Sequence, residues 1–159
     1  MQPLRLILLA LLSLTLASAR AEVAEKGKPF PKYNVEDAFG NAHSLSNQTR
    51  TVIITSEKDI STKVNDWLKT AGKDYLPSHK AEYVSDITPM PGIITTLFAL
   101  PKMKKYPFTI LLADDENFAK TYPAQKGKIA VYTLDDAQVL KDVAYVATAA
   151  EVAKIVEAK

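Results

Sequence analysis

The strongest constraint on the fold is a short β-branched and apolar run in the first half of the chain. Residues 51–55 read Thr-Val-Ile-Ile-Thr, and their centre lacks the polar alternation of a strand that faces water on one side. Apolar residues at helical spacing follow closely: Ile60, Val64, Trp67, Leu68 and Ala71. We therefore expect a buried central strand that leads, within a few residues, into an amphipathic helix capped by Asp59 or Ser61.

Strand and helix patterns alternate along most of the remaining sequence. A hairpin is indicated around the Gly40-Asn41 turn, and a capping box from Thr148 to Glu151 indicates a final helix. Further strands are expected at residues 80–84, 108–113, 128–134 and 139–145, with helical segments at residues 93–100 and 117–122. Pro101 is expected to kink or end the first of these helical segments. The order predicts one α/β domain, a sandwich in which helices flank a mixed central sheet behind an N-terminal hairpin.

The first 21 residues have the pattern of a secretory signal peptide. Arg5 precedes an apolar stretch over residues 6–17, and the small-residue motif Ala19-Arg20-Ala21 follows it. This stretch is shorter than the roughly 20 residues of a membrane-spanning helix, which disfavours the alternative of a retained anchor. We expect cleavage after Ala21, a mature domain over residues 22–159, and a periplasmic or secreted location.

Charge is balanced in the predicted mature chain. The full chain carries a formal net charge of +2, and cleavage after Ala21 removes Arg5 and Arg20 but no acidic residue. A balanced charge gives no global field that would attract nucleic acid or an anionic membrane. The chain has one local basic cluster, which we interpret as a solvated helix end: Lys102, Lys104 and Lys105. No segment after the signal peptide is predicted to span a membrane.

The side chains of most familiar catalytic and metal sites are scarce. The chain has no Cys, which excludes disulfides, cysteine nucleophiles and thiolate-bound metals. Its two histidines, His43 and His79, have no acidic or hydroxyl partner indicated by spacing. The acidic groups at residues 114–116 and 135–136 are typical of turns and helix starts, and no phosphate-binding glycine motif is present. We expect no cofactor and no bound metal.

Short motifs give a resemblance that covers nearly the whole predicted mature chain. Three segments resemble the peroxiredoxin-type and TlpA-type exported branches of the thioredoxin-like superfamily: Gly27-Lys28-Pro29-Phe30-Pro31, Asp37-Ala38-Phe39-Gly40 and residues 108–113. Three more are similar, in their order, to the small exported YtfJ-like group of the same fold: Pro91-Gly92, Lys104-Lys105-Tyr106-Pro107 and Asp114-Asp115. The resemblance implies a thioredoxin-like sandwich.

In thioredoxins, a Cys-x-x-Cys pair lies where the first central strand meets its helix, because the helix N-terminus stabilises a thiolate. Counted from the strand at residues 51–55, Asp59 and Thr62 fall at the two cysteine positions, and neither can exchange a disulfide. The stretch that matches the family's cis-proline, residues 125–128, has no proline. The resemblance thus implies a vacated redox position. Four polar residues around it form our candidate binding site: Ser56, Asp59, Ser61 and Thr62.

Three functions remain open at this point. The leading hypothesis is an exported, non-redox thioredoxin-like protein that binds a protein partner or a small ligand in the cell envelope. One alternative is a cysteine-independent enzyme with its site near Ser56 to Thr62, where a helix N-terminus can hold an anion. The other is a structural subunit of an envelope complex that uses the apolar residues 93–100. We expect that segment to be buried in the core in preference to being covered by a partner.

Overall fold

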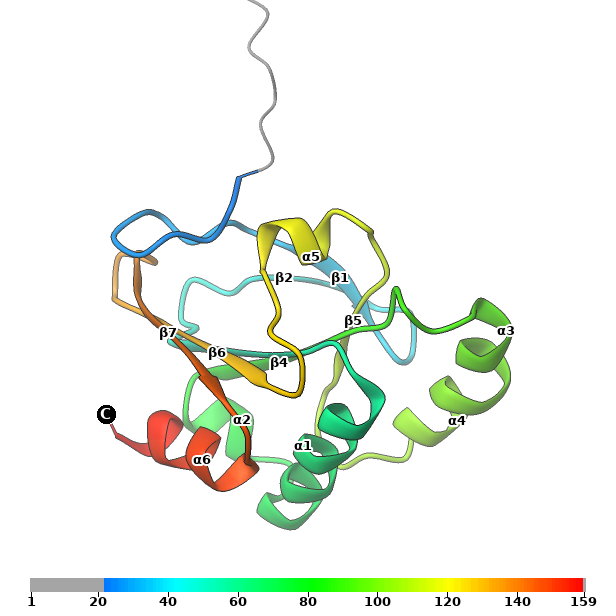
Figure 1. Ribbon diagram of the computed structural model, residues 1–159. Coiled ribbons are helices and arrows are strands. Elements are labelled where there is room, and N and C mark those ends of the chain that lie inside the picture. The colour runs from blue at the N-terminus through cyan, green and yellow to red at the C-terminus, as the bar shows by residue number, and fades with distance from the viewer. Residues whose placement is uncertain (1–21, 159) are drawn as a thin grey trace, which may run out of the picture.

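The computed structural model describes residues 22–158, so the predicted signal peptide lies outside the described residues. Within them, seven strands form one sheet in the order β2-β1-β5-β4-β3-β6-β7, and helices lie on both of its faces (Figure 1). The strands are β1 (Asn34–Asp37), β2 (Ala42–Ser44), β3 (Thr51–Thr55), β4 (Ala81–Asp86), β5 (Leu111–Ala113), β6 (Ile129–Leu134) and β7 (Leu140–Val146). The helices are α1 (Lys58–Ala71), α2 (Tyr75–Ser78), α3 (Gly92–Ile94), the π-helix η1 (Thr95–Ala99), α4 (Leu100–Met103), α5 (Phe118–Thr121) and α6 (Ala149–Glu157).

The sheet combines parallel and antiparallel pairs. Strands β3 and β5 both run parallel to β4, whereas β6 pairs antiparallel with β3, and β7 with β6. The β1–β2 hairpin joins the other side of the sheet through antiparallel pairing of β1 with β5. The predicted α/β sandwich, with a mixed central sheet, flanking helices and an N-terminal hairpin, is confirmed. In the described part of the chain, no helix has the length and apolar content needed to cross a bilayer.

Strand β3 is buried along its whole length, as predicted. Its side chains alternate between the two faces of the sheet. Ile53 joins the core that α1 and α6 cover, whereas Val52 and Ile54 join a second core that contains Phe118 of α5. In Figure 1, α1, α2 and α6 lie on one face of the sheet, while α5 and the N-terminal arm lie on the other. The sheet therefore separates two apolar layers. Most of the predicted stripe of α1 packs into the first of them, but Ala71, at the end of the stripe, is exposed.

The two helix starts indicated by the sequence have different outcomes. The capping box is confirmed, because the Thr148 hydroxyl accepts from the Glu151 N–H and the Glu151 carboxylate accepts from the Thr148 N–H at 3.0 Å. The predicted cap of α1 by Asp59 or Ser61 is wrong, because the helix begins earlier, with Glu57 as its N-cap residue. Glu57 does not cap the helix with its side chain, since its carboxylate bonds to a different loop.

Residues 92–103 form a helical lobe at the side of the domain, where α3, η1 and α4 follow one another (Figure 1). The helix continues through Pro101 itself and ends at Met103, two residues later, close to where the proline was expected to kink or end it. Ahead of it, the N–H of Leu100 bonds to the carbonyl of Thr95, five residues back, in a π-turn. This wider turn lets the helix continue through a proline that a regular α-helix would exclude.

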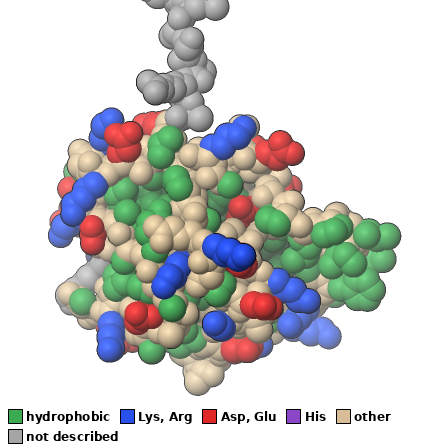
Figure 2. Space-filling view, viewed as in Figure 1, with side chains coloured by type: hydrophobic (Ala, Val, Ile, Leu, Met, Phe, Trp, Pro, Cys, Tyr) green, Lys and Arg blue, Asp and Glu red, His purple; other side chains and the backbone are tan. Residues whose placement is uncertain are grey.

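The apolar residues of the lobe are mostly exposed, so the expectation that residues 93–100 are buried in the core is wrong. Four of them, which we call the apolar tip, are 44% to 68% exposed: Ile93, Ile94, Leu97 and Phe98. Figure 2 shows apolar side chains gathered on this projecting lobe. Met103 belongs to the core, and Ala99 and Leu100 pack against it. The prediction fails because the lobe stands beside the sheet, so only its C-terminal end reaches the core.

Candidate functional site

The candidate site lies where β3 leads into α1, at the carboxyl ends of the parallel strands β3 and β4. A cavity of about 420 Å³ opens there between α1 and the lobe. One wall is polar and comes from the strand ends and the first turns of α1, with Ser56, Ser85 and Asp86 among its residues. The other wall is apolar and includes Met90 and Phe98. Ligands of open α/β sheets bind outside the carboxyl ends of the strands, and the cavity lies in that position.

Three of the four residues predicted from sequence line this cavity: Ser56, Ser61 and Thr62. Asp59 is exposed and is not part of the lining. The two hydroxyls on α1 differ in orientation. Thr62 is exposed and donates back to the carbonyl of Lys58 at 2.9 Å, whereas Ser61 is half-buried and contacts the sheet. The side chain that points inward at this junction is therefore Ser61.

Four hydroxyl groups meet beneath the cavity, on β3, α1 and β4. The Ser61 Oγ lies 2.7 Å from the Thr55 Oγ1, which in turn lies 3.0 Å from the Tyr83 Oη. The Ser85 Oγ is 3.5 Å from the Ser61 Oγ. Burial raises the pKa of Tyr83 to about 12, against the lowering effect of its hydroxyl partners. Tyr83 therefore keeps its proton at neutral pH, and the cluster holds no general base that would activate a serine.

Asn65 is the polar residue on α1 that the sequence analysis missed. Its side chain is 6% exposed, it lines the cavity, and no group of the described chain donates a hydrogen bond to its Oδ1. Leaving a buried acceptor unpaired costs roughly 1–3 kcal/mol, so such atoms in folded proteins call for a partner. The available signal was its position four residues after Ser61, which places both polar side chains on the inner face of α1.

The loop before β6 closes one side of the junction. The Gly127 N–H donates to the Glu57 Oε1, which joins residues far apart in the sequence. Residues 125–128 therefore lie next to the β3–α1 junction, where the resemblance implies a cis-proline in redox-active relatives. The peptide bonds of the described residues are all trans. A carboxylate–backbone contact therefore occupies this side of the β3–α1 junction.

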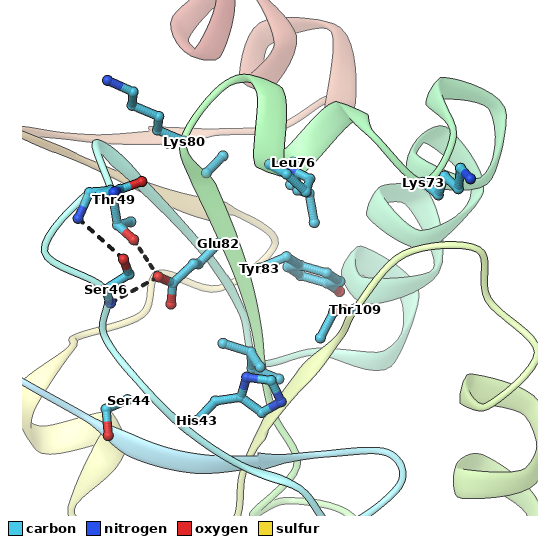
Figure 3. A pocket seen from close by; sticks show the side chains of 14 residues that line it. His43, Ser44, Ser46, Thr49, Lys73, Leu76, Lys80, Glu82, Tyr83 and Thr109 are labelled. Carbon is cyan, nitrogen blue, oxygen red and sulfur yellow. Dashed lines mark hydrogen bonds between the residues drawn. The ribbon is translucent and has the colours of Figure 1, made fainter.

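A second cavity, of about 390 Å³, lies beneath the β1–β2 hairpin (Figure 3). Glu82 lines it and accepts hydrogen bonds from the Tyr33 hydroxyl, from the Thr49 hydroxyl and, at 3.1 Å, from the Ser46 N–H. A carboxylate with three donors joins two loops to β4 and is a structural group. At the rim, the His43 Nε2 lies 3.0 Å from the Asp37 Oδ2, a pairing that spacing alone did not indicate.

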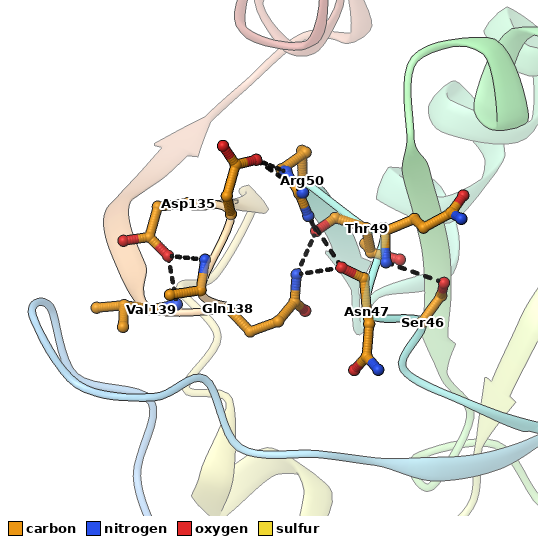
Figure 4. A network of polar contacts seen from close by, with 10 residues as sticks. Ser46, Asn47, Thr49, Arg50, Asp135, Gln138 and Val139 are labelled. Atoms are coloured by element: carbon orange, nitrogen blue, oxygen red, sulfur yellow. Dashed lines mark hydrogen bonds and ion pairs between the residues drawn. The ribbon is translucent and has the colours of Figure 1, made fainter.

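A polar network ties the β6–β7 turn to the segment before β3 (Figure 4). The Gln138 amide donates to the carbonyls of Asn47 and Thr49, and the Arg50 guanidinium lies 2.7 Å from Asp136. Asp135 accepts from two N–H groups of its own turn. These acidic residues stabilise a turn. Among residues 22–158, no group of three His, Asp or Glu side chains is placed to hold a metal ion.

Comparison with known proteins gives a fold and no sequence family. No protein-family model matches the chain, and no curated protein matches it in sequence. Among solved structures, it superposes on peroxidoxin BcpB from Mycobacterium tuberculosis with a TM-score of 0.57 and 12% identity, covering 84% of this chain and 94% of that one. The fold is thioredoxin-like.

Two further structures give the same thioredoxin-like fold. The thioredoxin domain of a thiol-disulfide oxidoreductase from Bacteroides vulgatus matches with a TM-score of 0.56 and 15% identity, over 84% of this chain and 96% of that one. StoA from Bacillus subtilis matches with a TM-score of 0.55 and 13% identity, over 80% of this chain and 97% of that one. Two of the three are described as a peroxidoxin and a thiol-disulfide oxidoreductase, whereas this thioredoxin-like chain has no Cys. The narrower resemblance to the YtfJ-like group has no counterpart among these matches.

Proposed function

We propose that this protein is an exported, non-redox thioredoxin-like binding protein, and that its ligand site is the cavity between α1 and the lobe. The unpaired Oδ1 of Asn65, buried in the wall of that cavity, is the observation that carries the proposal. A ligand that donates a hydrogen bond there removes the cost of an unsatisfied acceptor. In the cell envelope, the ligand bound at this site would be either a segment of a protein partner or a small molecule.

The walls of the cavity support a particular class of ligand. Ser56, Ser61 and Thr62 offer hydroxyls on one side, while Met90 and Phe98 offer apolar surface on the other. Small-molecule sites typically combine an apolar lining with a few polar groups that fix orientation. We therefore propose a ligand with an apolar side chain and an amide donor, such as a peptide segment or a small molecule with the same groups.

Binding is tested with a panel of N-acetyl amino-acid amides that carry apolar side chains, in a thermal-shift assay. We expect at least one member to raise the melting temperature of the wild-type protein. Asn65→Leu should abolish that shift, because it removes the acceptor and fills part of the cavity. The control is Asp59→Asn, which changes an exposed residue outside the lining and should leave the shift unchanged. A shift that survives Asn65→Leu would place the ligand elsewhere.

Export is a separate part of the proposal and has its own test. It rests on the apolar stretch at residues 6–17 and on the motif that ends at Ala21. Protein recovered from the periplasmic fraction should have an intact mass that begins at Glu22. A full-length product in the membrane fraction would contradict both the compartment and the balanced charge of the mature chain.

A further inference from the structure

Four of the six large apolar side chains that are exposed in the described chain belong to the apolar tip. Phe98 and Ile93 are 66% and 68% exposed, and the residues between the tip's members are threonines, which carry no charge. Single exposed apolar side chains are ordinary, but a contiguous exposed group on one element marks an interaction site. Ile94 and Phe98 also reach the cavity, whereas Ile93 and Leu97 lie outside its lining and are 68% and 58% exposed. Apolar side chains gather on this lobe in Figure 2.

Positive charge follows the apolar tip along the same lobe. We call three residues at its C-terminal end the lysine cluster: Lys102, Lys104 and Lys105. All three are exposed, and none takes part in an ion pair with another described residue. At a helical rise of 1.5 Å per residue, Lys104 lies about 9 Å along the axis from Phe98. The Lys104 Nζ lies 5.8 Å from the centre of the Phe39 ring, which is itself 66% exposed.

This arrangement matches what a helix needs to lie at a membrane surface. Such helices bury an apolar face about 5–10 Å into the boundary between headgroups and acyl chains, with lysines at the headgroups. The apolar tip and the lysine cluster lie next to each other on one short lobe, so the apolar side chains can enter this boundary while the lysines stay at the headgroups. Charge complementarity therefore favours anionic lipid as the occupant of this surface.

We propose that the lobe docks onto an anionic lipid bilayer, with the apolar tip inserted at the headgroup boundary and the lysine cluster against the phosphates. The attraction is local and does not require a net positive charge on the chain. The docking surface adjoins the ligand cavity, since Ile94, Phe98 and Lys102 also line that cavity. Leu97, Lys104 and Lys105 lie outside the lining, so variants at these positions test docking separately from ligand binding. The docking also explains why large apolar side chains remain in water in the isolated chain.

Vesicle flotation tests the proposal, with vesicles of phosphatidylcholine alone or mixed with phosphatidylglycerol. We expect the purified protein to float with the mixed vesicles, and high salt to weaken binding through screening. Replacing all three lysines of the cluster by Gln should lower partitioning about 100-fold, since each lysine near an anionic surface contributes about 1 kcal/mol. Leu97→Ser and Phe98→Ser should each lower it at least about tenfold, through lost apolar burial.

Matched controls separate the lobe from the rest of the molecule. Lys73→Gln, Lys126→Gln and Lys141→Gln together remove the same charge from exposed sites elsewhere and should reduce partitioning much less. Val23→Ser removes an exposed apolar side chain outside the lobe and should have no effect. All variants share one N-terminus, fixed by intact mass, so differences among them report the lobe. Circular dichroism confirms that each variant is folded.

Insertion has a direct optical readout. In Phe98→Trp, the new indole should shift its emission to the blue on mixed vesicles and be quenched by brominated lipid, against the constant background of Trp67. Equal binding to both kinds of vesicle, or binding unaffected by the lysine and tip variants, would overturn the proposal. So would absence of vesicle binding together with self-association that Leu97→Ser abolishes, since the tip would then be an interface between protein molecules.

Discussion

Helix α1 and the lobe face each other across the cavity, and they differ in which side chains they bury and which they expose. Ile60 of α1 is 5% exposed, whereas Phe98 of the lobe is 66% exposed. The buried face of α1 also includes Asn65, a polar residue without a partner for its Oδ1, while the exposed face of the lobe is apolar. A buried polar group and an exposed apolar patch are the two departures from ordinary burial that carry information. Their occurrence on facing elements is the reason we propose this junction as the functional region.

The largest expected change in the free energy of unfolding comes from a substitution on the buried face of α1. Leu68→Ala on α1 should lower the free energy of unfolding by about 2–5 kcal/mol, because the side chain is fully buried and its removal leaves a cavity. Leu97→Ala on the lobe is the matched change and should cost less than about 0.5 kcal/mol. Urea unfolding measures both. Similar losses for the two variants would mean that the lobe is packed in solution.

Asn65 allows a test in the opposite direction. Asn65→Leu should raise the free energy of unfolding by about 1–2 kcal/mol, because it removes a buried unpaired acceptor and adds apolar contact. Residues kept for binding often reduce stability in this way. Thermal and urea unfolding of the ligand-free protein measure the change. A variant less stable than the wild type would show that the amide of Asn65 is satisfied and would remove the main support for the cavity as a ligand site.

The neighbouring hydroxyls of α1 give a smaller, paired prediction. Ser61→Ala should cost about 1 kcal/mol, because it breaks the 2.7 Å contact with Thr55 beside the buried Tyr83. Thr62→Ala should change stability by less than about 0.5 kcal/mol, since Thr62 is exposed and bonds only within the helix. The order of the two effects in urea unfolding reports which side chain faces the sheet. The reverse order would mean that Thr62, and not Ser61, contacts the sheet.

The smallest effect concerns the turn that carries Phe39 toward the lobe. Burial alone would raise the pKa of Asp37, but hydrogen bonds from Asn41, His43 and backbone N–H groups hold it well below its ordinary value of 3.8. This stabilisation is therefore fully present above pH 3.8 and is lost as pH falls toward the folded-state pKa. Asp37→Asn should cost about 0.5 kcal/mol at neutral pH, because the asparagine oxygen still accepts part of the network. The difference from the wild type should vanish in acid; a constant difference across the pH range would contradict the assigned role of the carboxylate.

Fold and site differ in how far sequence could predict them. The run at residues 51–55, the stripe of α1 apart from the exposed Ala71, and the Thr148 capping box each specify local structure through nearby residues, and they are confirmed. The exposure of the lobe was not predictable, because periodicity tells which side chains share a face but not what covers that face. The contacts of Gly127 with Glu57 and of Ser61 with Thr55 depend on how distant segments meet, so spacing alone did not contain them.

The π-turn at Thr95–Ala99 fixes an angle as well as accommodating Pro101. Each residue of an α-helix advances the chain by about 100° around the axis, so a turn that takes in one more residue rotates everything before it by that amount. The apolar tip lies before and within this turn, and the lysines lie after Pro101. The extra residue in the π-turn therefore sets the direction in which the tip points relative to the lysines. Deleting one threonine here and replacing Pro101 by Ala would restore regular pitch. The same side chains would then point about a quarter-turn away, so these two changes would redirect the apolar tip without altering any residue in it.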